Sequence, residues 1–359
     1  MTPFLRLFVL ALGLLVLDRI SLPVATSSPR IECVAGCGSE PLGGPARSAR
    51  LIEPFGVAFD RQGNWYLCEY QGQRVTKVDP KGLITLFAGR DLASSTLPDG
   101  GPLEFHDPHG LVIAPDQQLY VADTLNHRVI KIDLKTGRAR VAAGTGRQGY
   151  SGDGGPAVEA SFNQLYAVDL TRAGDKLYLT DLGNRRIRLL DLKSGVVNTV
   201  AGNGQSGVPA DGTEARTGPL VDPRAAAIDA RGNLYILERR GNALRVVDPG
   251  GKIRTVLGPG LIRSATGTAP DLNGPKHLCL DPRGNVIIAD TENHLIRKYN
   301  PKDGSTVVIA GTGEKGDRLL PDDPLKTQLN RPHGVTVHAS GALYISDSDN
   351  HRLLKLSNW

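Results

Sequence analysis

With 359 residues, of which 40% are hydrophobic, the chain can bury a large core, which excludes an intrinsically disordered protein. Its 42 Lys and Arg residues barely outnumber its 37 Asp and Glu, for a net charge of +5, and no run of five basic residues occurs, which argues against nucleic acid as the main partner. The 43 glycines and 24 prolines are spread along the chain, a composition typical of an all-β protein with many turns.

Residues 1–26 are predicted to be an export signal or an N-terminal anchor, and residues 27–359 the folded domain. Arg6 precedes an apolar run over residues 7–17, which is too short to span a bilayer comfortably and favours a cleaved signal. Asp18 and Arg19 follow the apolar run directly, which is atypical of a cleaved signal. An uncleaved membrane anchor therefore remains an alternative. We therefore expect an exported protein, periplasmic or extracellular, that is membrane-tethered only if residues 7–17 are retained.

Four cysteines occur, and they allow three pairings in an oxidising compartment. Two cysteines four positions apart on an extended strand lie about 13 Å apart, beyond disulfide reach, so the sequence does not favour a bond between the first two. No pair has the C-x-x-C spacing of a zinc site. The cysteines are Cys33, Cys37, Cys68 and Cys279.

From residue 51 onward, one pattern of apolar strands and turns recurs six times. The second strand of each copy is followed by a carboxylate, and these carboxylates are 54, 58, 57, 52 and 57 residues apart. So regular a period indicates six copies of one supersecondary unit. The carboxylates are Glu69, Asp123, Asp181, Glu238, Asp290 and Asp347.

Each copy is predicted to be a four-stranded antiparallel sheet, such as GLVIA, LYVAD, RVIKID and ARVAAG in the second copy. One such sheet cannot bury both of its faces, so the copies must stack, and a ring removes the exposed ends of the stack. We predict an all-β fold, a six-bladed β-propeller, with blades that start near residues 51, 105, 162, 220, 272 and 329.

The sixth copy stops at Trp359 before a fourth strand appears. The segment IECVAGCG, residues 31–38, is similar to the fourth strand VNTVAGNG, residues 197–204. We therefore predict that the N-terminal segment 31–38 completes the last blade, which joins the two chain ends and covers an open sheet edge.

The stretch GTGRQG, residues 144–149, has the G-x-G-x-x-G spacing of dinucleotide-binding loops. The same spacing recurs as GNGQSG at 202–207 and GTGEKG at 311–316, each after a predicted fourth strand. None of the three opens a helix, which a pyrophosphate turn requires. The glycines are interpreted as turns between blades, and no dinucleotide cofactor is expected.

The copies resemble NHL repeats, whose triplet occurs in full as Asn293-His294-Leu295 and with a following arginine at Asn126-His127 and Asn350-His351. The resemblance covers about 310 residues, and it implies a six-bladed propeller. The family includes protein-binding and RNA-binding domains, extracellular sensor domains of membrane kinases and the peptidyl-hydroxyglycine amidating lyases. It therefore implies a fold and leaves the function open.

In four copies an arginine lies five positions after the carboxylate, as in Asp123 with Arg128 and Asp181 with Arg186. We interpret these carboxylates as a structural ring of ion pairs across hairpins. In the fourth and fifth copies Ala243 and Leu295 replace that arginine, which predicts that Glu238 and Asp290 lack this partner.

A second ring consists of the residues that follow the first position of each inner strand, a proline in five of the six copies. We expect these side chains to surround one mouth of the central channel. They differ from copy to copy, as a binding site for one asymmetric ligand requires. The alternative is that they are solvent-exposed loop residues that vary freely and bind nothing. The rim residues are Phe55, His109, Tyr166, Arg224, Lys276 and His333.

The rim allows two roles for its cations and one for its histidines. Arg224 and Lys276 either neutralise the unpaired carboxylates or hold an anionic or peptide ligand. The resemblance to amidating lyases implies that three histidines at rim positions bind a zinc ion. Only His109 and His333 match this pattern, because the third rim position is occupied by Arg224. His277 is the nearest further histidine, but it lies one residue beyond the rim position of its blade. These two histidines are weak metal candidates, and Asp-Gly turns at Asp99 and Asp153 leave calcium as a further alternative.

We therefore expect a secreted, monomeric binding scaffold for a peptide, protein or small-molecule ligand, with no cofactor and no catalytic residue assigned. A metal-dependent lyase or hydrolase is the alternative. Nucleic acid is not expected as a partner, because only 5% of the residues are aromatic and RNA recognition needs stacking aromatics on a basic face.

Overall fold

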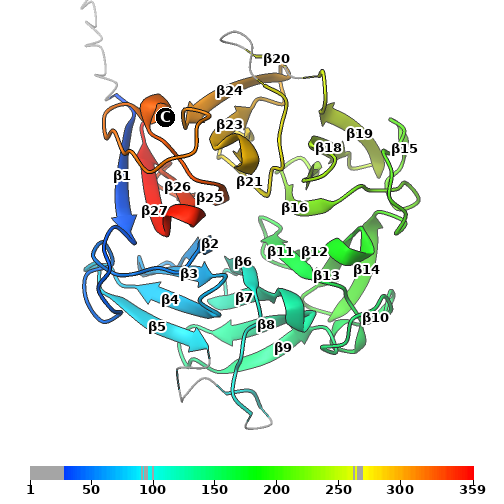
Figure 1. Ribbon diagram of the computed structural model, residues 1–359. Coiled ribbons are helices and arrows are strands. Elements are labelled where there is room, and N and C mark those ends of the chain that lie inside the picture. Colours follow the sequence, from blue (N-terminus) through cyan, green and yellow to red (C-terminus); the bar gives the residue numbers. More distant parts are fainter. Residues whose placement is uncertain (1–27, 90–91, 93–95, 99–100, 262, 265–269) are drawn as a thin grey trace, which may run out of the picture.

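The computed structural model describes residues 28–359, apart from residues 90–91, 93–95, 99–100, 262 and 265–269. The predicted export segment, residues 1–26, lies outside the described residues, as does Asp99 of the calcium hypothesis. Within the described part, no helix is long and apolar enough to cross a membrane. The chain forms a ring of six antiparallel sheets, which confirms the predicted six-bladed β-propeller (Figure 1).

In the first three blades, consecutive hairpins place the first strand innermost and the fourth outermost. The first blade consists of β2 (Pro54–Phe59), β3 (Trp65–Glu69), β4 (Arg74–Val78) and β5 (Ile84–Gly89). The second consists of β6 (Pro108–Ile113), β7 (Gln118–Asp123), β8 (Arg128–Asp133) and β9 (Ala139–Ala143). The third consists of β11 (Leu165–Leu170), β12 (Lys176–Asp181), β13 (Arg186–Asp191) and β14 (Val196–Ala201), with the short β10 (Gly155–Pro156) outside β14.

The fourth and fifth blades repeat this order, each with a two-residue strand added outside. The fourth consists of β16 (Pro223–Ile228), β17 (Leu234–Glu238), β18 (Ala243–Val247), β19 (Lys252–Leu257) and β15 (Thr213–Glu214). The fifth consists of β21 (His277–Leu280), β22 (Val286–Asp290), β23 (Leu295–Tyr299), β24 (Ser305–Ala310) and β20 (Arg263–Ser264). The sixth contributes β25 (Pro332–Val337), β26 (Leu343–Asp347) and β27 (Arg352–Ser357).

Six short 3₁₀ helices occur in the described connections, and four of them join the second strand of a blade to the third. These four begin directly after a ring carboxylate and end before a residue in the left-handed conformation. The helices are η1 (Thr124–Asn126), η2 (Ala157–Glu159), η3 (Leu182–Asn184), η4 (Thr291–Asn293), η5 (Pro324–Lys326) and η6 (Ser348–Asn350).

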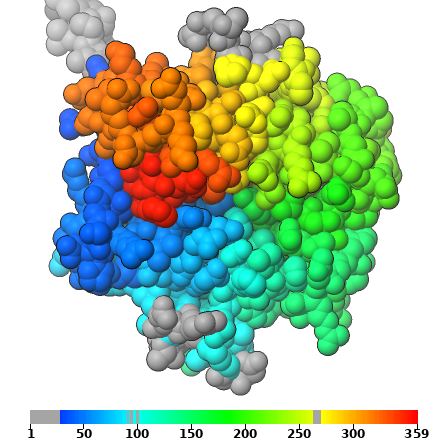
Figure 2. Space-filling view, in the orientation of Figure 1, coloured from blue at the N-terminus to red at the C-terminus, as the bar shows by residue number. Residues whose placement is uncertain are grey.

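The N-terminal strand completes the last blade. The strand β1 (Arg30–Ala35) pairs antiparallel with β27, so that Ile31 lies opposite Leu356 and Cys33 opposite Leu354. Ile31 and Cys33 are buried, and the last blade lies directly beside the first (Figures 1 and 2). The predicted closure by residues near 31–38 is confirmed, although the paired strand ends at Ala35.

The expectation for the first two cysteines was wrong, because Cys33 and Cys37 form a disulfide with a Cα–Cα distance of 6.3 Å. The strand does not stay extended as far as Cys37. It has a register irregularity between Cys33 and Ala35, and the next residue, Gly36, turns the chain with a φ of 74°. A side chain on Gly36 would meet the carbonyl oxygen of His351, so glycine is required there. Cys68 and Cys279 are free thiols.

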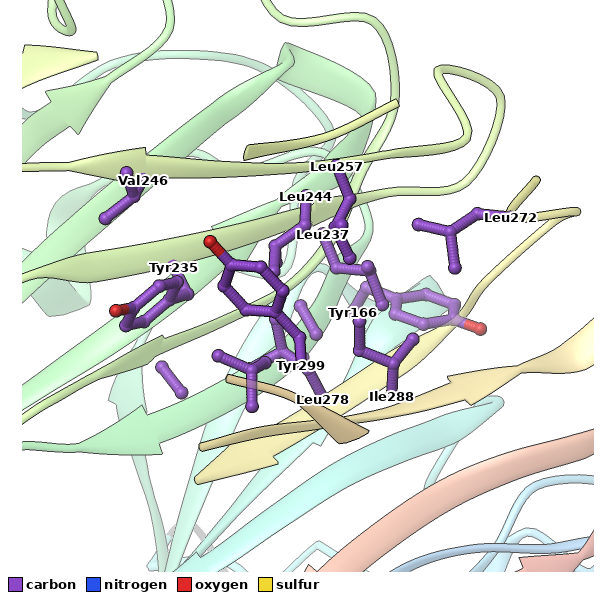
Figure 3. Close-up of a cluster of buried hydrophobic side chains, with 14 of the residues drawn as sticks. Tyr166, Tyr235, Leu237, Leu244, Val246, Leu257, Leu272, Leu278, Ile288 and Tyr299 are labelled. Carbon is purple, nitrogen blue, oxygen red and sulfur yellow. The ribbon is translucent and has the colours of Figure 1, made fainter. Parts of the chain in front are cut away.

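The core lies between the blades, where the faces of neighbouring sheets pack together. Figure 3 shows the cluster shared by the fourth and fifth blades, with Tyr235 and Leu237 on β17 and Leu278 and Ile288 on β21 and β22. Tyr166 of the predicted rim belongs to the same cluster. The rim is therefore supported by the packed core and is not an independent loop.

Candidate functional site

All six predicted rim residues line one cavity of about 390 Å³ at the channel mouth. Five of them are the second residue of an inner strand, and Lys276 directly precedes β21. The inner strands surround the centre of the ring (Figure 1), so a residue at this position in each blade faces the shared mouth. The same cavity is also lined by Glu53, Tyr70, Gln71, Arg239, Arg331 and Asp349.

A repeated hydrogen bond holds the backbone two residues before the rim position. In three blades the histidine of the NHL triplet accepts a backbone N–H from the next blade through Nδ1, as His127 does from Gln164 at 3.0 Å and His294 does from Arg331 at 3.1 Å. Because both residues of each pair have a positive φ, two tight turns meet at each junction. The complete set pairs Gln73 with Asp107, His127 with Gln164, Asn242 with Gly274, His294 with Arg331 and His351 with Glu53.

This role of the triplet was missed from the sequence, where the histidines served only to suggest the family. The signal that would have found it is the constant spacing: each of these side chains comes four residues after the ring carboxylate. In the third blade Arg185 holds the equivalent position. Five junctions of the ring therefore carry a hydrogen bond of this kind.

One half of the mouth is aromatic. The Phe55 ring lies edge-on to His109 at 4.9 Å between ring centroids, and His109 lies 4.2 Å from Tyr166. Tyr70 also packs on His109, with 4.7 Å between the ring centroids. Nδ1 of His109 lies 2.7 Å from the carbonyl oxygen of Asp107, so Nδ1 carries the proton and Nε2 is the unprotonated nitrogen.

Burial lowers the pKa of His109 to about 3, so its imidazole is neutral at physiological pH. A neutral ring packed among Phe55, Tyr70 and Tyr166 presents an apolar surface with one acceptor nitrogen. This half of the mouth is suited to an apolar or aromatic part of a ligand.

The other half is cationic and is supplied by Arg224, Arg239, Lys276 and Arg331. The guanidinium of Arg224 lies over the Tyr166 ring, 4.6 Å from its centroid, and its Nε is 3.6 Å from Asp222. Arg239 and Arg331 both contact Glu292, at 3.5 and 2.9 Å. Against these four cations, only Glu53 and Asp349 among the cavity-lining residues are acidic.

Lys276 lies deep in this half, with 8% of its surface exposed. Its Nζ is 2.6 Å from Nε2 of His333, and none of the described carboxylates lies within ion-pair distance of it. Burial is the main cause that lowers the pKa of Lys276 to about 7, and the nearby Arg331 and Arg239 lower it further. Burial and the charge of Lys276 also hold the pKa of His333 well below its usual value.

The carboxylate ring lies apart from this cavity and is buried, with all six side chains fully inaccessible. Each carboxylate accepts a backbone N–H from the loop that precedes its blade, such as that of His106 on Asp123 and that of Asn273 on Asp290, both at 2.8 Å. The predicted ion pairs form between Glu69 and Arg74, Asp123 and Arg128, and Asp347 and Arg352.

Three predictions about this ring were wrong. Asp181 contacts Arg188 at 3.4 Å, whereas Arg186 donates to the carbonyl oxygens of Asn184 and Asn203. Glu238 and Asp290 are not left without an arginine, since the former binds Arg245 and the latter Arg297. Arg224 and Lys276 therefore do not neutralise these carboxylates. Arg224 lies beside Asp222 instead, and the side chains of Arg224 and Lys276 both line the cavity.

The two candidate metal ligands are close but incomplete as a site. His109 and His333 flank Phe55, with ring centroids 4.9 and 5.2 Å from it. His277 lies further away, and its Nδ1 accepts the backbone N–H of Val335. Over the residues that the structure describes, no group of three His, Cys, Asp or Glu is placed to hold a metal ion. Asp153, the described member of the calcium hypothesis, binds Arg188 at 2.8 Å.

Fold and site together define a six-bladed β-propeller with a half-aromatic, half-cationic cavity at one channel mouth. The chain is similar to the NHL-repeat propellers: a model of the teneurin NHL domain matches residues 191–358 and a model of the NHL repeat matches residues 105–132. The resemblance inferred from the triplets is thereby confirmed.

The curated relatives are longer proteins. The chain is 27% identical to the chloroplastic protein SUPPRESSOR OF QUENCHING 1 of Arabidopsis thaliana, over 68% of the chain and 24% of that protein. It is 24% identical to NHL repeat-containing protein 2 of Gallus gallus, over 84% of the chain and 46% of that protein. The chain thus spans less than half of either relative, and nothing about the activity of the whole proteins transfers directly.

Solved structures support the fold alone. A protein of unknown function from Bacteroides thetaiotaomicron superposes with a TM-score of 0.66 at 15% identity, covering 92% of the chain and 76% of that protein. A putative gluconolactonase superposes with a TM-score of 0.58 at 12% identity, covering 91% of both chains. At such identities the shared architecture carries no catalytic assignment.

Proposed function

We propose that the protein is an exported binding propeller that captures an anionic group of a peptide, protein or small-molecule ligand at the channel mouth. The observation that carries this proposal is the single cavity formed by all six rim residues, in which four cations face two carboxylates. Clustered guanidinium groups favour carboxylate ligands because they offer paired N–H donors.

The size and the walls of the cavity narrow the ligand further. A volume of about 390 Å³ is near the lower end for ligand pockets, which suits a small molecule or the terminal residue of a peptide. The aromatic half, with Phe55, His109 and Tyr166, suits an apolar group beside the anion. A metal-dependent lyase or hydrolase has no observation in its favour, since the described residues supply no third metal ligand.

Export is part of this proposal, and the disulfide between Cys33 and Cys37 supports it. Disulfides persist in oxidising compartments and are rare in the reducing cytosol. A disulfide next to the strand that closes the ring is consistent with a domain that folds outside the cytosol.

The first test uses phenyllactate as a probe, because it joins a carboxylate to an aromatic ring. Binding to the wild-type chain is expected by calorimetry or ligand-observed NMR, whereas the Arg224→Ala, Lys276→Ala double variant should bind at least about tenfold more weakly, since the Arg224 guanidinium and the Lys276 amine are both lost. Phenyllactamide, which lacks the negative charge, should bind neither protein measurably.

Arg231→Ala is the matched control, because the Arg231 side chain is exposed and is not among the residues lining the cavity. It removes an arginine from the same blade and should leave phenyllactate binding unchanged. The proposal fails if the double variant, with an unchanged unfolding midpoint, binds phenyllactate as tightly as the wild type. Equal loss of binding in Arg231→Ala would also contradict it.

A further inference from the structure

The amine of Lys276 is unusual among the described lysines. It lies at the wall of the cavity, its closest polar neighbour is the imidazole of His333 at 2.6 Å, and arginines surround it. The charged groups near it are Arg224, Arg239, Arg331, Glu53 and Glu292, and the neutral imidazoles of His109 and His333 lie in the same cavity. Of the two carboxylates, Glu292 is itself bound by two of those arginines. No salt bridge among the described residues compensates the ammonium form.

This environment favours the neutral amine, since burial removes water from the ammonium group and neighbouring cations repel it. With a pKa of about 7, far below that of an ordinary lysine, Lys276 carries a neutral amine in a substantial fraction of the molecules at physiological pH. When the amine donates one N–H to Nε2 of His333, its lone pair stays free to face the cavity. A desolvated lysine next to other cations is the arrangement that activates amine nucleophiles.

We propose that Lys276 is a nucleophile that forms an imine with the carbonyl group of a small oxo acid held at the channel mouth. The inference rests on the proposed function, because the cations of the same cavity must first hold the carboxylate. Arg224, stacked on Tyr166 and only loosely paired with Asp222 at 3.6 Å, is the cation best placed to hold it.

The reaction balances without any other reagent. The amine lone pair attacks the carbonyl carbon, a C–N bond forms, and the π electrons of the carbonyl move to its oxygen. Nε2 of His333 takes one proton from the nitrogen and passes it to that oxygen, which becomes a hydroxyl group. Nε2 then takes the second proton of the nitrogen and passes it to the hydroxyl group, which departs as water while the nitrogen lone pair forms the C=N bond. One amine and one carbonyl thus give one imine and one water.

His333 is suited to carry this proton for two reasons. Its Nε2 is in direct contact with the amine, and its buried Nδ1 has no hydrogen-bond partner in the described structure. Because its own pKa is strongly lowered, the imidazolium form is short-lived and returns the proton readily. His333 therefore carries protons from the amine nitrogen to the carbonyl oxygen, so this oxygen of the bound oxo acid must lie within reach of Nε2.

The test incubates the full chain with phenylpyruvate and cyanoborohydride, which reduces an imine to a stable secondary amine, and locates the adduct by peptide mass spectrometry. Ordinary lysine amines are almost wholly protonated at pH 7, so labelling at Lys276 should exceed that at an exposed lysine by roughly 10²-fold or more. Lys302, which is exposed, provides the comparison within the same sample.

The pH dependence gives a second readout. The neutral fraction of Lys276 rises as pH rises through about 7 and then levels off. The ratio of labelling at Lys276 to labelling at Lys302 should therefore be highest and nearly constant below about pH 7, and should fall as the pH rises towards 10, where ordinary lysine amines also become neutral. Because both peptides come from the same reaction, changes in the reductant with pH cancel.

Variants separate the steps. Lys276→Arg keeps the charge but should give no adduct above the exposed lysines, and Lys302→Arg should label normally at Lys276. His333→Gln should slow adduct formation at saturating phenylpyruvate, whereas Arg224→Gln should raise the concentration needed for saturation. Phenyllactate, which has the same carboxylate and no carbonyl, should compete with labelling.

Two outcomes overturn the inference in distinguishable ways. If phenyllactate binds but Lys276 is labelled no more than Lys302, the imine proposal is wrong and the proposed function stands. If neither acid binds and no selective adduct forms, both proposals fail.

Discussion

At the scale of single residues, each buried carboxylate of the ring is paired with an arginine, but this arginine comes from one of two sequence positions, five or seven residues after the carboxylate. In a hairpin such as β7–β8, Asp123 lies directly opposite Arg128, five residues later. In β22–β23 the residue opposite Asp290 is Leu295, and the pairing arginine, Arg297, lies two positions further along the same face. A long arginine spans this diagonal, so the sequence rule of five residues missed half of the pairs.

Removing Arg297 should therefore destabilise the fold strongly, because it leaves Asp290 buried and unpaired. We expect Arg297→Met to lower the free energy of unfolding by about 3–5 kcal/mol in urea denaturation. Adding Leu295→Arg, which restores the spacing of the second blade, should recover part of the loss. An Arg297→Met protein as stable as the wild type would refute this account of the ring.

At the scale of the elements, the turn that carries the NHL triplet connects one blade to the next through a hydrogen bond. The residue after each of the helices η1, η4 and η6 is a histidine in the left-handed conformation, and its Nδ1 accepts a backbone N–H from the following blade. The bond at His351 reaches Glu53 and so connects the last blade to the first. Sequence alone identified the triplet but not this contact, because the partner lies in another repeat.

The contribution of this hydrogen bond to stability can be measured by replacing His294. We expect His294→Ala to cost about 1–3 kcal/mol of stability, because the N–H of Arg331 loses its acceptor. His294→Asn should retain most of the stability, since Asn242 makes the same bond to Gly274 in the fourth blade at 2.8 Å. Urea unfolding midpoints test this ranking, and it is wrong if alanine and asparagine behave alike.

At the scale of the whole molecule, stability depends on closing the ring. The strand β1 buries Ile31 and Ala35 and covers the edge of β27, which would otherwise be open. The two chain ends are thereby joined in one sheet, and the nearby disulfide fastens the turn that follows β1. The closure could be predicted because the last repeat lacked a strand and the first described segment matched one.

A chain beginning at Ser39, which lacks β1 and the disulfide, should lose at least about 3 kcal/mol relative to one beginning at Ser28, because apolar side chains and a sheet edge become exposed. The Cys33→Ser, Cys37→Ser variant keeps the strand and should lose only about 2 kcal/mol. Denaturation under non-reducing conditions compares the three. If the shortened chain is no less stable than the serine variant, the strand contributes nothing to closure.

The sequence by itself determined the repeat, the number of blades, the closing strand and the positions of the rim, because each of these follows from a period of apolar strands and turns. Only the tertiary structure decided which charges meet: that Arg245 and Arg297 hold the carboxylates, that Cys33 reaches Cys37, and that Lys276 lies against His333. The physical reason is that a period records which face of a strand a residue occupies, whereas a contact between side chains depends on reach, on local turns and on strands brought in from other blades.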